Sequence, residues 1–408
     1  MKNSLLLNLY FFVLFIYNAA SCSLLTVTDW APWYYSSIPV ALSIIVAITY
    51  NVNLFDRKLL TMLAILAIWN GAQYFFNHVS PSPYGFMLLV IAWVAYSVFN
   101  NELSDRFVSL TYKLSIVSLI VWLLCLLAPT TMHSIGANYG IDTMDASYSF
   151  LFFNINKGES LRNCGFCWEP GRYSCILMMA LYFHYIKYGL ANRNWKFYVL
   201  LFSLLSTVST TGFIALFVFA IYHVLKRRIL NPFYIASLIA IFLYVWNLPF
   251  MSEKIHIFGL EEGHFEQSVS NMEWASSHGA TQQVYCPQRF DGMAFQWMNV
   301  THMNPIIGDS HNFTRFYINE VLGYNVVASE GILFMILCYG LIIGILCYFF
   351  MIKSSFFWGR RFGGNYIWLF FILFMVMNFS YNFWEFPLYT TIWLWAYFEG
   401  GKVAFKTT

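Results

Sequence analysis

Charge is what this sequence has least of. Only 10% of its 408 residues are Asp, Glu, Lys or Arg, whereas about a quarter of a soluble domain is charged. Apolar residues are abundant instead: 59% of the chain is hydrophobic and 21% is aromatic. Because so few polar side chains cannot cover a water-exposed surface, the composition excludes a soluble protein and predicts an integral membrane protein. The formal net charge of +3 is also too small to indicate binding to nucleic acid.

Metal-site and disulfide patterns are also scarce. Most of the eight cysteines lie in or beside apolar runs, where cysteine usually acts as a small hydrophobic residue. Cys164 and Cys167 form a single CxxC pair, without further cysteines or histidines at a spacing typical of zinc sites. A disulfide between them in an oxidising compartment and an incidental structural role both remain open. We expect no metal site at this pair.

Long apolar runs indicate the fold. A helix needs roughly 17–25 apolar residues to cross a bilayer, and about twelve runs approach this length, which predicts an all-α polytopic membrane protein. They lie near 5–25, 37–55, 58–76, 84–100, 107–128, 169–188, 195–210, 211–225, 230–250, 326–350, 365–381 and 386–399. We interpret the first run as a retained signal anchor rather than a cleaved signal peptide. We interpret 195–225 as two short helices that turn near the STVSTTG stretch at 206–212, with one long tilted helix as the alternative.

The basic residues indicate how the spans are oriented. If successive spans cross the membrane in opposite directions, most lysines and arginines fall on the same side as the N-terminus. Such residues accumulate on the cytoplasmic side of a membrane. Both termini are therefore expected inside the cell. The chain divides into an N-terminal five-helix membrane region (1–128), an outer loop (129–168), central membrane helices (169–250), a large outer loop (251–325) and a C-terminal three-helix membrane region (326–408).

Polar chemistry collects in the two outer loops. Most of the nine histidines and most acidic residues lie outside the spans, whose middles are nearly free of charge. A transporter is expected to place ionisable groups or unwound helices near the membrane midplane, and only 206–212 fits that description. The distribution favours an enzyme that acts on a lipid-linked substrate at the outer membrane boundary over a transporter or a non-catalytic scaffold.

The stretch RNCGFCWEPG (162–171) brings charges to the start of an apolar run. Pro170 suits the first turn of a helix, and Glu169 faces the positive end of that helix's dipole, so a simple helix start explains both residues. It does not explain Arg162 and Arg172. Two guanidinium groups beside a helix N-terminus can clamp a diphosphate, because arginine binds phosphate oxygens with two hydrogen bonds and the N-terminal amides add donors.

A second polar group lies in GDSHNFTRFYINEVLGY (308–324), just before the span near 326. If 310–322 is helical, His311 and Arg315 share one face. Histidine changes its charge near neutral pH and suits removal of a proton from a sugar hydroxyl. The alternative is a solvated amphipathic helix that lies on the membrane.

In their order along the chain, these segments resemble the O-antigen polymerase and O-antigen ligase superfamily. RNCGFCWEPG is similar to that family's Arg-x-x-Gly-hydrophobic-x-x-Glu-Pro signature, and LLSTVSTTGFIALFVF (204–219) resembles the Ser/Thr-rich span that follows it. SHNFTRFYINEVLGYNVVASEGILF (310–334) is similar to the family's His-Asn segment, which ends a large periplasmic loop and leads into an apolar helix. The resemblance covers roughly 150–350 of this chain, and loosely the rest.

The resemblance implies a GT-C-like glycosyltransferase of the bacterial inner membrane, with its active site facing the periplasm. Such enzymes take an oligosaccharide from undecaprenyl diphosphate, so the resemblance also implies that no metal, nucleotide sugar or redox cofactor is needed. A polymerase transfers the oligosaccharide to a sugar hydroxyl of another lipid-linked repeat unit in O-antigen, capsule or exopolysaccharide synthesis, and a ligase transfers it to lipid A-core. Polymerase is the activity we expect, since one genome can carry several polymerases but needs few ligases. A chain-length regulator and a flippase are the expected membrane partners.

The same resemblance gives roles to the polar residues. Those expected to bind the diphosphate leaving group are the arginines Arg162, Arg172, Arg289 and Arg315. His311 is the candidate for accepting the proton of the acceptor hydroxyl, and Asn312 the candidate for hydrogen-bonding a sugar. Glu169 either orients an arginine or is itself the base.

Overall fold

The structure, a computed structural model, describes most of the chain. It describes residues 4–19, 32–143, 147–150, 153–156, 162–167, 169–189, 194–227, 283–285, 289–309, 325–327 and 331–400, with the single positions 236, 240, 243, 247, 270, 317 and 319. Most of the span expected near 230–250 and most of the loop 251–325 lie outside the described residues.

Helices dominate the described part, because most of the apolar runs fold as helices. In chain order these are α1 (Ser4–Ala19), α3 (Pro32–Tyr50), α4 (Arg57–Asn77), α5 (Tyr84–Phe99), the 3₁₀ turn η1 (Asn100–Glu102), α6 (Leu103–Leu127), α7 (Pro129–Tyr139), α8 (Pro170–Tyr188), α9 (Trp195–Ser206), α10 (Thr210–Arg227), α14 (Arg289–His302), α16 (Phe334–Arg360), α17 (Leu369–Ser380), α18 (Pro387–Trp393) and α19 (Trp395–Glu399). Three of them, α4, α6 and α16, are long and apolar enough to cross a membrane. Six more carry shorter apolar stretches of 10–17 residues. The chain is therefore a helical membrane protein, as its composition predicted.

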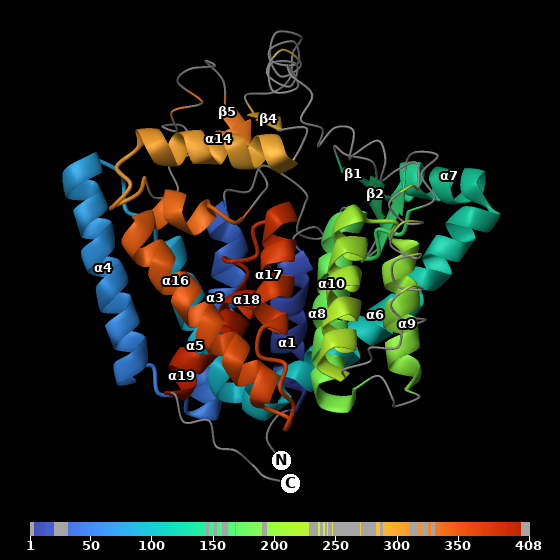
Figure 1. Cartoon of the computed structure of the whole chain (residues 1–408), viewed down its shortest axis with the longest axis horizontal. Helices are drawn as coiled ribbons and strands as arrows, with labels where there is room; N and C mark the ends of the chain where they lie inside the picture. The colour runs from blue at the N-terminus through green and yellow to red at the C-terminus, as the bar shows by residue number, and fades with distance from the viewer. Residues whose placement is uncertain are drawn as a thin grey trace.

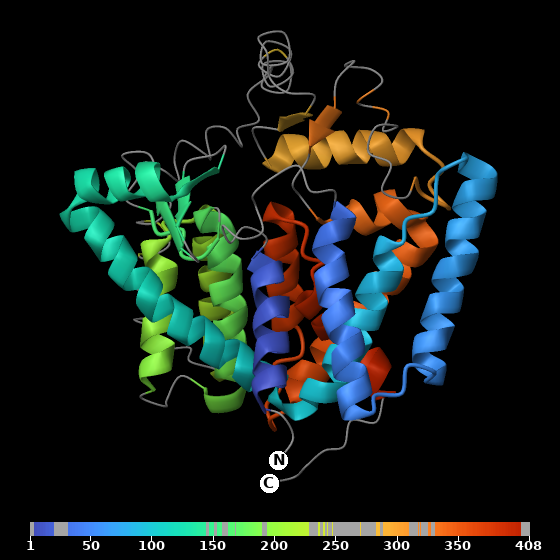
Figure 2. The same ribbon diagram turned by 180° about the vertical axis from the view of Figure 1, so that it is seen from behind.

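The bundle has two different ends (Figure 1). Both chain termini lie at one end, and α7, the strands and α14 lie at the other, where α14 runs across the ends of the bundle helices. Seen from both sides, α4 stands at one edge of the molecule and α6 with α7 at the opposite edge (Figure 2).

Two small sheets are added to the helical bundle. The loop 129–168 contains α7 and an antiparallel sheet in the order β1 (Ile141–Thr143), β2 (Ser147–Phe150) and β3 (Phe153–Asn156). A parallel pair joins β4 (Gln283–Tyr285) to β5 (Asn325–Val327), with Val284 opposite Val326. This pairing joins the middle of the large loop 251–325 to its C-terminal end.

Helix α8 is the centre of the bundle. Its side chains from Tyr173 to Ile186 are all buried, and it packs against α6, α9, α10 and α17. A helix that is apolar on all sides is stable only when other helices cover it. Pro170 occupies the first turn, as predicted, and Glu169 is the N-cap residue.

The interpretation of 195–225 as two short helices is confirmed. Helix α9 ends at Ser206 and α10 starts at Thr210. Between them Val208 has φ 45°, a left-handed conformation that a β-branched residue rarely adopts. Both helices pack against α8.

Two other spans differ from the prediction. Instead of one span at 386–399, the chain forms two short helices, α18 and α19, whose side chains are largely buried within the bundle. Instead of 326–350, α16 covers Phe334–Arg360. Its late start has a local cause: the N–H of Gly331 donates to the carbonyl of Asn378 (2.6 Å), so this segment is held against α17 before the helix begins.

Helix α16 is also broken at Gly340, where φ is 73°. A break leaves backbone carbonyls without their partners in the helix, and side chains of α4 donate to them. The Nε1 atom of Trp69 donates to the carbonyl of Tyr339 (2.8 Å), and the Nε2 atom of Gln73 donates to that of Cys338 (2.6 Å). These bonds fasten α4 to α16 near the end of the bundle that carries α14.

Candidate functional site

A cavity opens where α8 and α10 begin and α17 ends. Its empty volume is about 1070 Å³, the open mouth included. The polar residues in its lining are Arg162, Glu169, Ser209, Thr210, Thr211, Ser380 and Tyr381, and the apolar ones include Pro170, Ile214, Ile332, Met375 and Phe379. Two of the predicted site residues, Arg162 and Glu169, therefore meet in one cavity.

Arg162 is the positively charged residue in the lining of this cavity. Its Nε atom donates to the carbonyl of Thr207 (3.3 Å), in the turn between α9 and α10. Burial lowers the pKa of the Arg162 guanidinium, and the nearby Cys164 and Glu169 act in the opposite direction. Because arginine titrates above pH 12 in water, the group keeps its positive charge at neutral pH.

Asn163 fixes the loop that carries Arg162. Its Oδ1 atom accepts from the Ser118 hydroxyl (2.8 Å) and from the N–H of Gly165 (2.9 Å), while its Nδ2 atom donates to the Ser206 hydroxyl (2.9 Å). Its own N–H donates to the carbonyl of Ser206 (3.0 Å). The side chain is 3% exposed, so all its hydrogen-bonding atoms are satisfied inside the protein, by α6, α9 and the loop itself.

The same loop is held from its other side by β3. The N–H of Asn154 donates to the carbonyl of Gly165 (2.9 Å), and the Asn154 side chain donates to the carbonyl of Cys167. Gly165 has φ 59°, and an added Cβ would lie 2.6 Å from the Tyr173 ring. Only glycine fits this turn without strain.

Two helix N-termini face the cavity. The first amides of an α-helix lack partners within the helix and carry the positive end of its dipole, so α8 and α10 both offer donors to an anion. The Ser174 hydroxyl joins the two starts, donating to the carbonyl of Gly171 (2.7 Å) and lying 3.2 Å from the Ser209 hydroxyl. The Thr211 hydroxyl is hydrogen-bonded to that of Ser380 on α17.

Thr210 supplies a hydroxyl at the first position of α10. The residue is 8% exposed and lines the cavity, yet its Oγ1 atom has no hydrogen-bond partner among the described residues. A buried hydroxyl without a partner is costly. A ligand in the cavity would supply the missing acceptor.

Arg172 lies beside the cavity rather than in its lining. Its guanidinium carbon is 5.3 Å from the ring centre of Tyr381 and 5.0 Å from that of Phe386, close enough for cation–π attraction. Tyr381 lines the cavity, and a Cβ added at Gly171 would overlap its hydroxyl. Arg172 thus supports the aromatic side of the cavity and the tight contact of α8 with the segment after α17.

The cysteines of the CxxC pair are free thiols in the structure, and both are buried. They close a tight turn in which the N–H of Cys167 donates to the carbonyl of Cys164 (3.0 Å). Burial raises the pKa of the Cys164 thiol to about 12, although Arg162 opposes the shift. A thiol in this state is protonated at neutral pH and is therefore a poor nucleophile.

Of the second polar group, 308–324, the structure describes residues 308, 309, 317 and 319. Arg289 is the first residue of α14, while His311, Asn312 and Arg315 lie outside the described residues. The segment that leads to them is held at the break in α16, where the N–H of Asp309 donates to the carbonyl of Leu337 (2.9 Å). Across the described residues no group of three His, Cys, Asp or Glu side chains is arranged to hold a metal.

Sequence reasoning missed Asn163, Thr210 and Tyr381. Asn163 and Thr210 stand in the two motifs that were singled out, and their residue types alone gave no signal, because buried partners far away in the chain decide their importance. Tyr381 follows an apolar run and looked like an ordinary interfacial aromatic residue.

The arrangement is suited to binding a phosphorylated or otherwise anionic group beside an apolar wall. It combines a guanidinium, the starts of two helices and a hydroxyl. No family model, no curated protein and no solved structure matches this chain.

Proposed function

We propose that this protein is a membrane glycosyltransferase that polymerises lipid-linked oligosaccharide repeat units. The observation that carries the proposal is the meeting of Arg162, the N-termini of α8 and α10, and the Thr210 hydroxyl at one cavity. These groups suit the diphosphate of an undecaprenyl-diphosphate-linked glycan, because guanidinium and helix amides both donate to phosphate oxygens. The resemblance of 162–171 and 204–219 to the O-antigen polymerase and ligase superfamily supports the same substrate.

The proposed reaction exchanges one C–O bond for another. A sugar hydroxyl of the acceptor repeat unit attacks the anomeric carbon of the donor glycan, and the bond from that carbon to the diphosphate oxygen breaks. The acceptor hydroxyl loses its proton to a base, and undecaprenyl diphosphate leaves with the bonding electron pair. Arg162 and the helix amides stabilise the charge that builds up on the diphosphate, the kind of contribution whose loss typically costs about 100-fold or more in rate.

Two residues are candidates for the base. His311 suits the role because histidine accepts protons near neutral pH, and the anchoring of Asp309 to α16 holds the chain two residues away from it. Glu169 lies in the cavity lining with Arg162, so it either takes the proton or keeps the guanidinium in place. Arg172, Arg289 and Arg315 are further diphosphate ligands in this proposal, and Asn312 is a sugar ligand.

The proposed topology has twelve spans with both termini in the cytoplasm and a large periplasmic loop at 251–325, in a GT-C-like bundle in the bacterial inner membrane. Two observations support it. The termini lie at the same end of the bundle (Figure 1). The ends of α8, α10 and α16, with Lys187, Lys226 and Arg360, and the start of α4, with Arg57, carry the basic residues expected at a cytoplasmic face.

A transporter is the alternative that one observation favours. The break between α9 and α10 at 207–209 borders the cavity, and transporters use broken helices of this kind to bind substrates. Under this alternative, substitutions at Ser209 and Thr210 would abolish uptake or export of a solute, and the size distribution of the surface glycan would not change.

The experiment that separates the candidates uses a strain lacking the gene, with its surface polysaccharide separated by size on a gel. A polymerase predicts loss of the long-chain ladder while a single repeat stays attached to lipid A-core. A ligase predicts loss of all attached glycan, with polymer left on the carrier lipid. An unchanged ladder would contradict both enzyme proposals.

Complementation of that strain tests the cavity itself. Arg162→Ala is expected to insert normally but to leave the ladder absent, and Arg162→Lys to restore it only in part, because lysine keeps the charge without the bidentate geometry. Arg57→Ala is the matched control: it removes an exposed guanidinium from the start of α4 and should restore the full ladder. A full ladder with Arg162→Ala would contradict the assigned role.

A further inference from the structure

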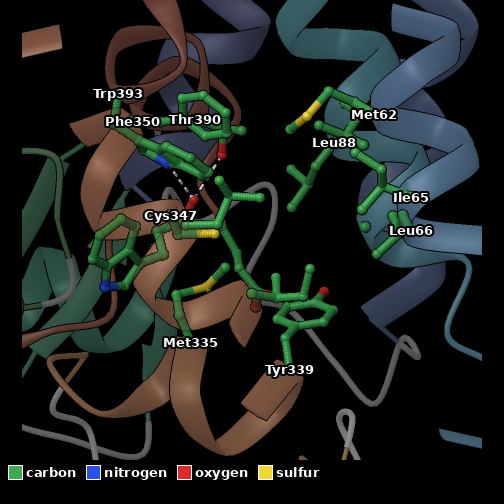
Figure 3. A pocket seen from close by; sticks show the side chains of 16 residues that line it. Met62, Ile65, Leu66, Leu88, Met335, Tyr339, Cys347, Phe350, Thr390 and Trp393 are labelled. Atoms are coloured by element: carbon green, nitrogen blue, oxygen red, sulfur yellow. Dashed lines mark hydrogen bonds between the residues drawn. The ribbon is translucent and has the colours of Figure 1, made fainter. Parts of the chain in front are cut away.

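A second cavity lies between α4, α5 and α16 and has no arginine in its lining. Figure 3 shows the two sides of it: Met62, Ile65 and Leu66 of α4 face Met335, Tyr339 and Cys347 of α16 across open space. Its empty volume is about 650 Å³, space open to the surroundings included. Side chains of α5 and of the segment 384–393 complete the wall.

The lining residues of α16 lie on both sides of its break at Gly340. Met335 and Tyr339 come before the break, and Ile343, Leu346, Cys347 and Phe350 come after it. The last four recur every three or four residues, so they share one face of that part of the helix, which is about 10 Å long at 1.5 Å per residue. The cavity is therefore a slot lined by both parts of α16, and it can take part of an extended chain.

Several polar side chains of the slot have hydrogen-bond partners within the protein and need no water. Trp384 donates through Nε1 to the carbonyl of Gly331 (2.8 Å), and both Trp393 Nε1 (3.0 Å) and the Thr390 hydroxyl (2.7 Å) donate to the carbonyl of Trp384. These polar side chains are already satisfied, and apart from Glu385 and the Tyr339 hydroxyl the rest of the lining is apolar. An apolar lining of this kind favours hydrocarbon over water.

The hydrocarbon around the slot is the bilayer. Helix α4 is apolar and long enough to cross it, and it exposes Leu60, Ile68, Phe75 and Phe76 on its outer side. The slot is lined by α4, which stands at the edge of the bundle (Figures 1 and 2). Lipid chains are therefore the molecules that reach it first.

One acidic residue lies in the lining of the slot. Glu385 is the single acid among the sixteen residues of the lining. Its side chain is hydrogen-bonded to the Tyr339 hydroxyl, and its carbonyl accepts from the hydroxyl of Tyr84 (3.0 Å), the first residue of α5. A carboxylate at this place attracts a cationic group.

We propose that the slot binds one phospholipid with an ammonium head group, its acyl chain lying along α16 and its head beside Glu385. The two features act together: the apolar stripe holds the chain, and the carboxylate selects the head. The proposal is independent of the glycosyltransferase assignment, because it involves none of the residues that line the Arg162 cavity.

The test uses photo-crosslinking of the full chain in vesicles of phosphatidylethanolamine and phosphatidylglycerol. Either lipid is added in trace amounts as a probe with a diazirine on its acyl chain, and labelled peptides are identified by mass spectrometry. We expect the phosphatidylethanolamine probe to label residues 62–66 and 335–350 several-fold more than the phosphatidylglycerol probe does. Glu385→Gln should remove that preference.

Leu66→Trp, which fills the slot, should lower labelling of 335–350 at least fivefold. Ile68→Trp, on the same helix but 73% exposed on its outer side, should leave it unchanged. Labelling confined to outward residues such as Ile68 and Ile345 would overturn the proposal, as would equal labelling by the two probes. Loss of labelling on addition of a polyprenyl phosphate would assign the slot to an isoprenoid chain instead and would equally overturn it. The wild-type labelling pattern decides these outcomes even if Leu66→Trp fails to fold.

Discussion

Replacing Asn163 with alanine removes the side chain that fixes the Arg162 loop. Three hydrogen bonds are lost, to Ser118, Ser206 and the N–H of Gly165. At about 1 kcal/mol net for each bond, the expected loss of unfolding free energy is about 3 kcal/mol, and the Gly165 N–H, left buried without its acceptor, keeps the cost from being smaller. Asn163 is an unusually sensitive position because its side chain bridges α6, α9 and the loop.

Equilibrium unfolding of the purified protein in detergent, followed by tryptophan fluorescence, measures this loss. The matched control is Asn138→Ala, which removes the same side chain from an exposed position on α7, where the expected change is within about 0.5 kcal/mol. Glycan polymerisation should fall with Asn163→Ala in the population that stays folded, since Arg162 is no longer held at the cavity. Equal stability of the two variants would refute the assignment of Asn163 as the anchor of the loop.

Three further predictions follow from single positions. Gly340→Ala should destabilise the protein by more than Gly363→Ala, although both glycines have φ 73°. An added Cβ at Gly340 would overlap the carbonyl of Ile306, whereas one at Gly363 would have nothing within 4 Å. Gly363→Ala should therefore cost only about 1–2 kcal/mol for the left-handed backbone, and thermal unfolding of both variants checks the order. Iodoacetamide at pH 8 should leave Cys164 unmodified in the folded protein and modify it after denaturation. The reason is that burial raises the thiol pKa to about 12 and keeps the thiol protonated until the protein unfolds. Mass spectrometry of the peptide measures the modification, and rapid modification of the folded chain would contradict the buried position. Thr210→Val should preserve folding but lower glycan polymerisation, whereas Thr210→Ser should retain polymerisation, because only the hydroxyl contacts the proposed ligand. Equal activity of the two variants would remove Thr210 from the site.

The apolar runs were sufficient to predict most helix positions. Helices α4, α5, α8 and α10 lie within a few residues of the predicted spans, because lipid-exposed or core-buried helices need continuous apolar sequence. The break at 206–212 could also be predicted, since basic residues on both sides required the chain to cross and return. Pro170 marked the start of α8 correctly.

The breaks inside α16 and between α18 and α19 could not be read from the sequence in the same way. Gly340 lies in an unbroken apolar run, and its conformation depends on contacts with Pro305–Gly308 and with side chains of α4. Such partners are distant in the chain, so no local pattern reports them. The same reason applies to the site. Arg162 and Glu169 were predicted, but the hydrogen bonds of Asn163 and the buried Thr210 hydroxyl, which has no partner among the described residues, were not.

The most direct test of the proposed activity is a transfer assay with the purified protein in vesicles. The substrate is the single repeat unit linked to undecaprenyl diphosphate, and the products are separated by chain length. The proposed activity predicts that the wild-type protein releases one undecaprenyl diphosphate for each repeat added, and that Arg162→Ala loses about 100-fold or more of this rate. Absence of chain growth with the wild-type protein, or equal rates for the two proteins, would contradict it.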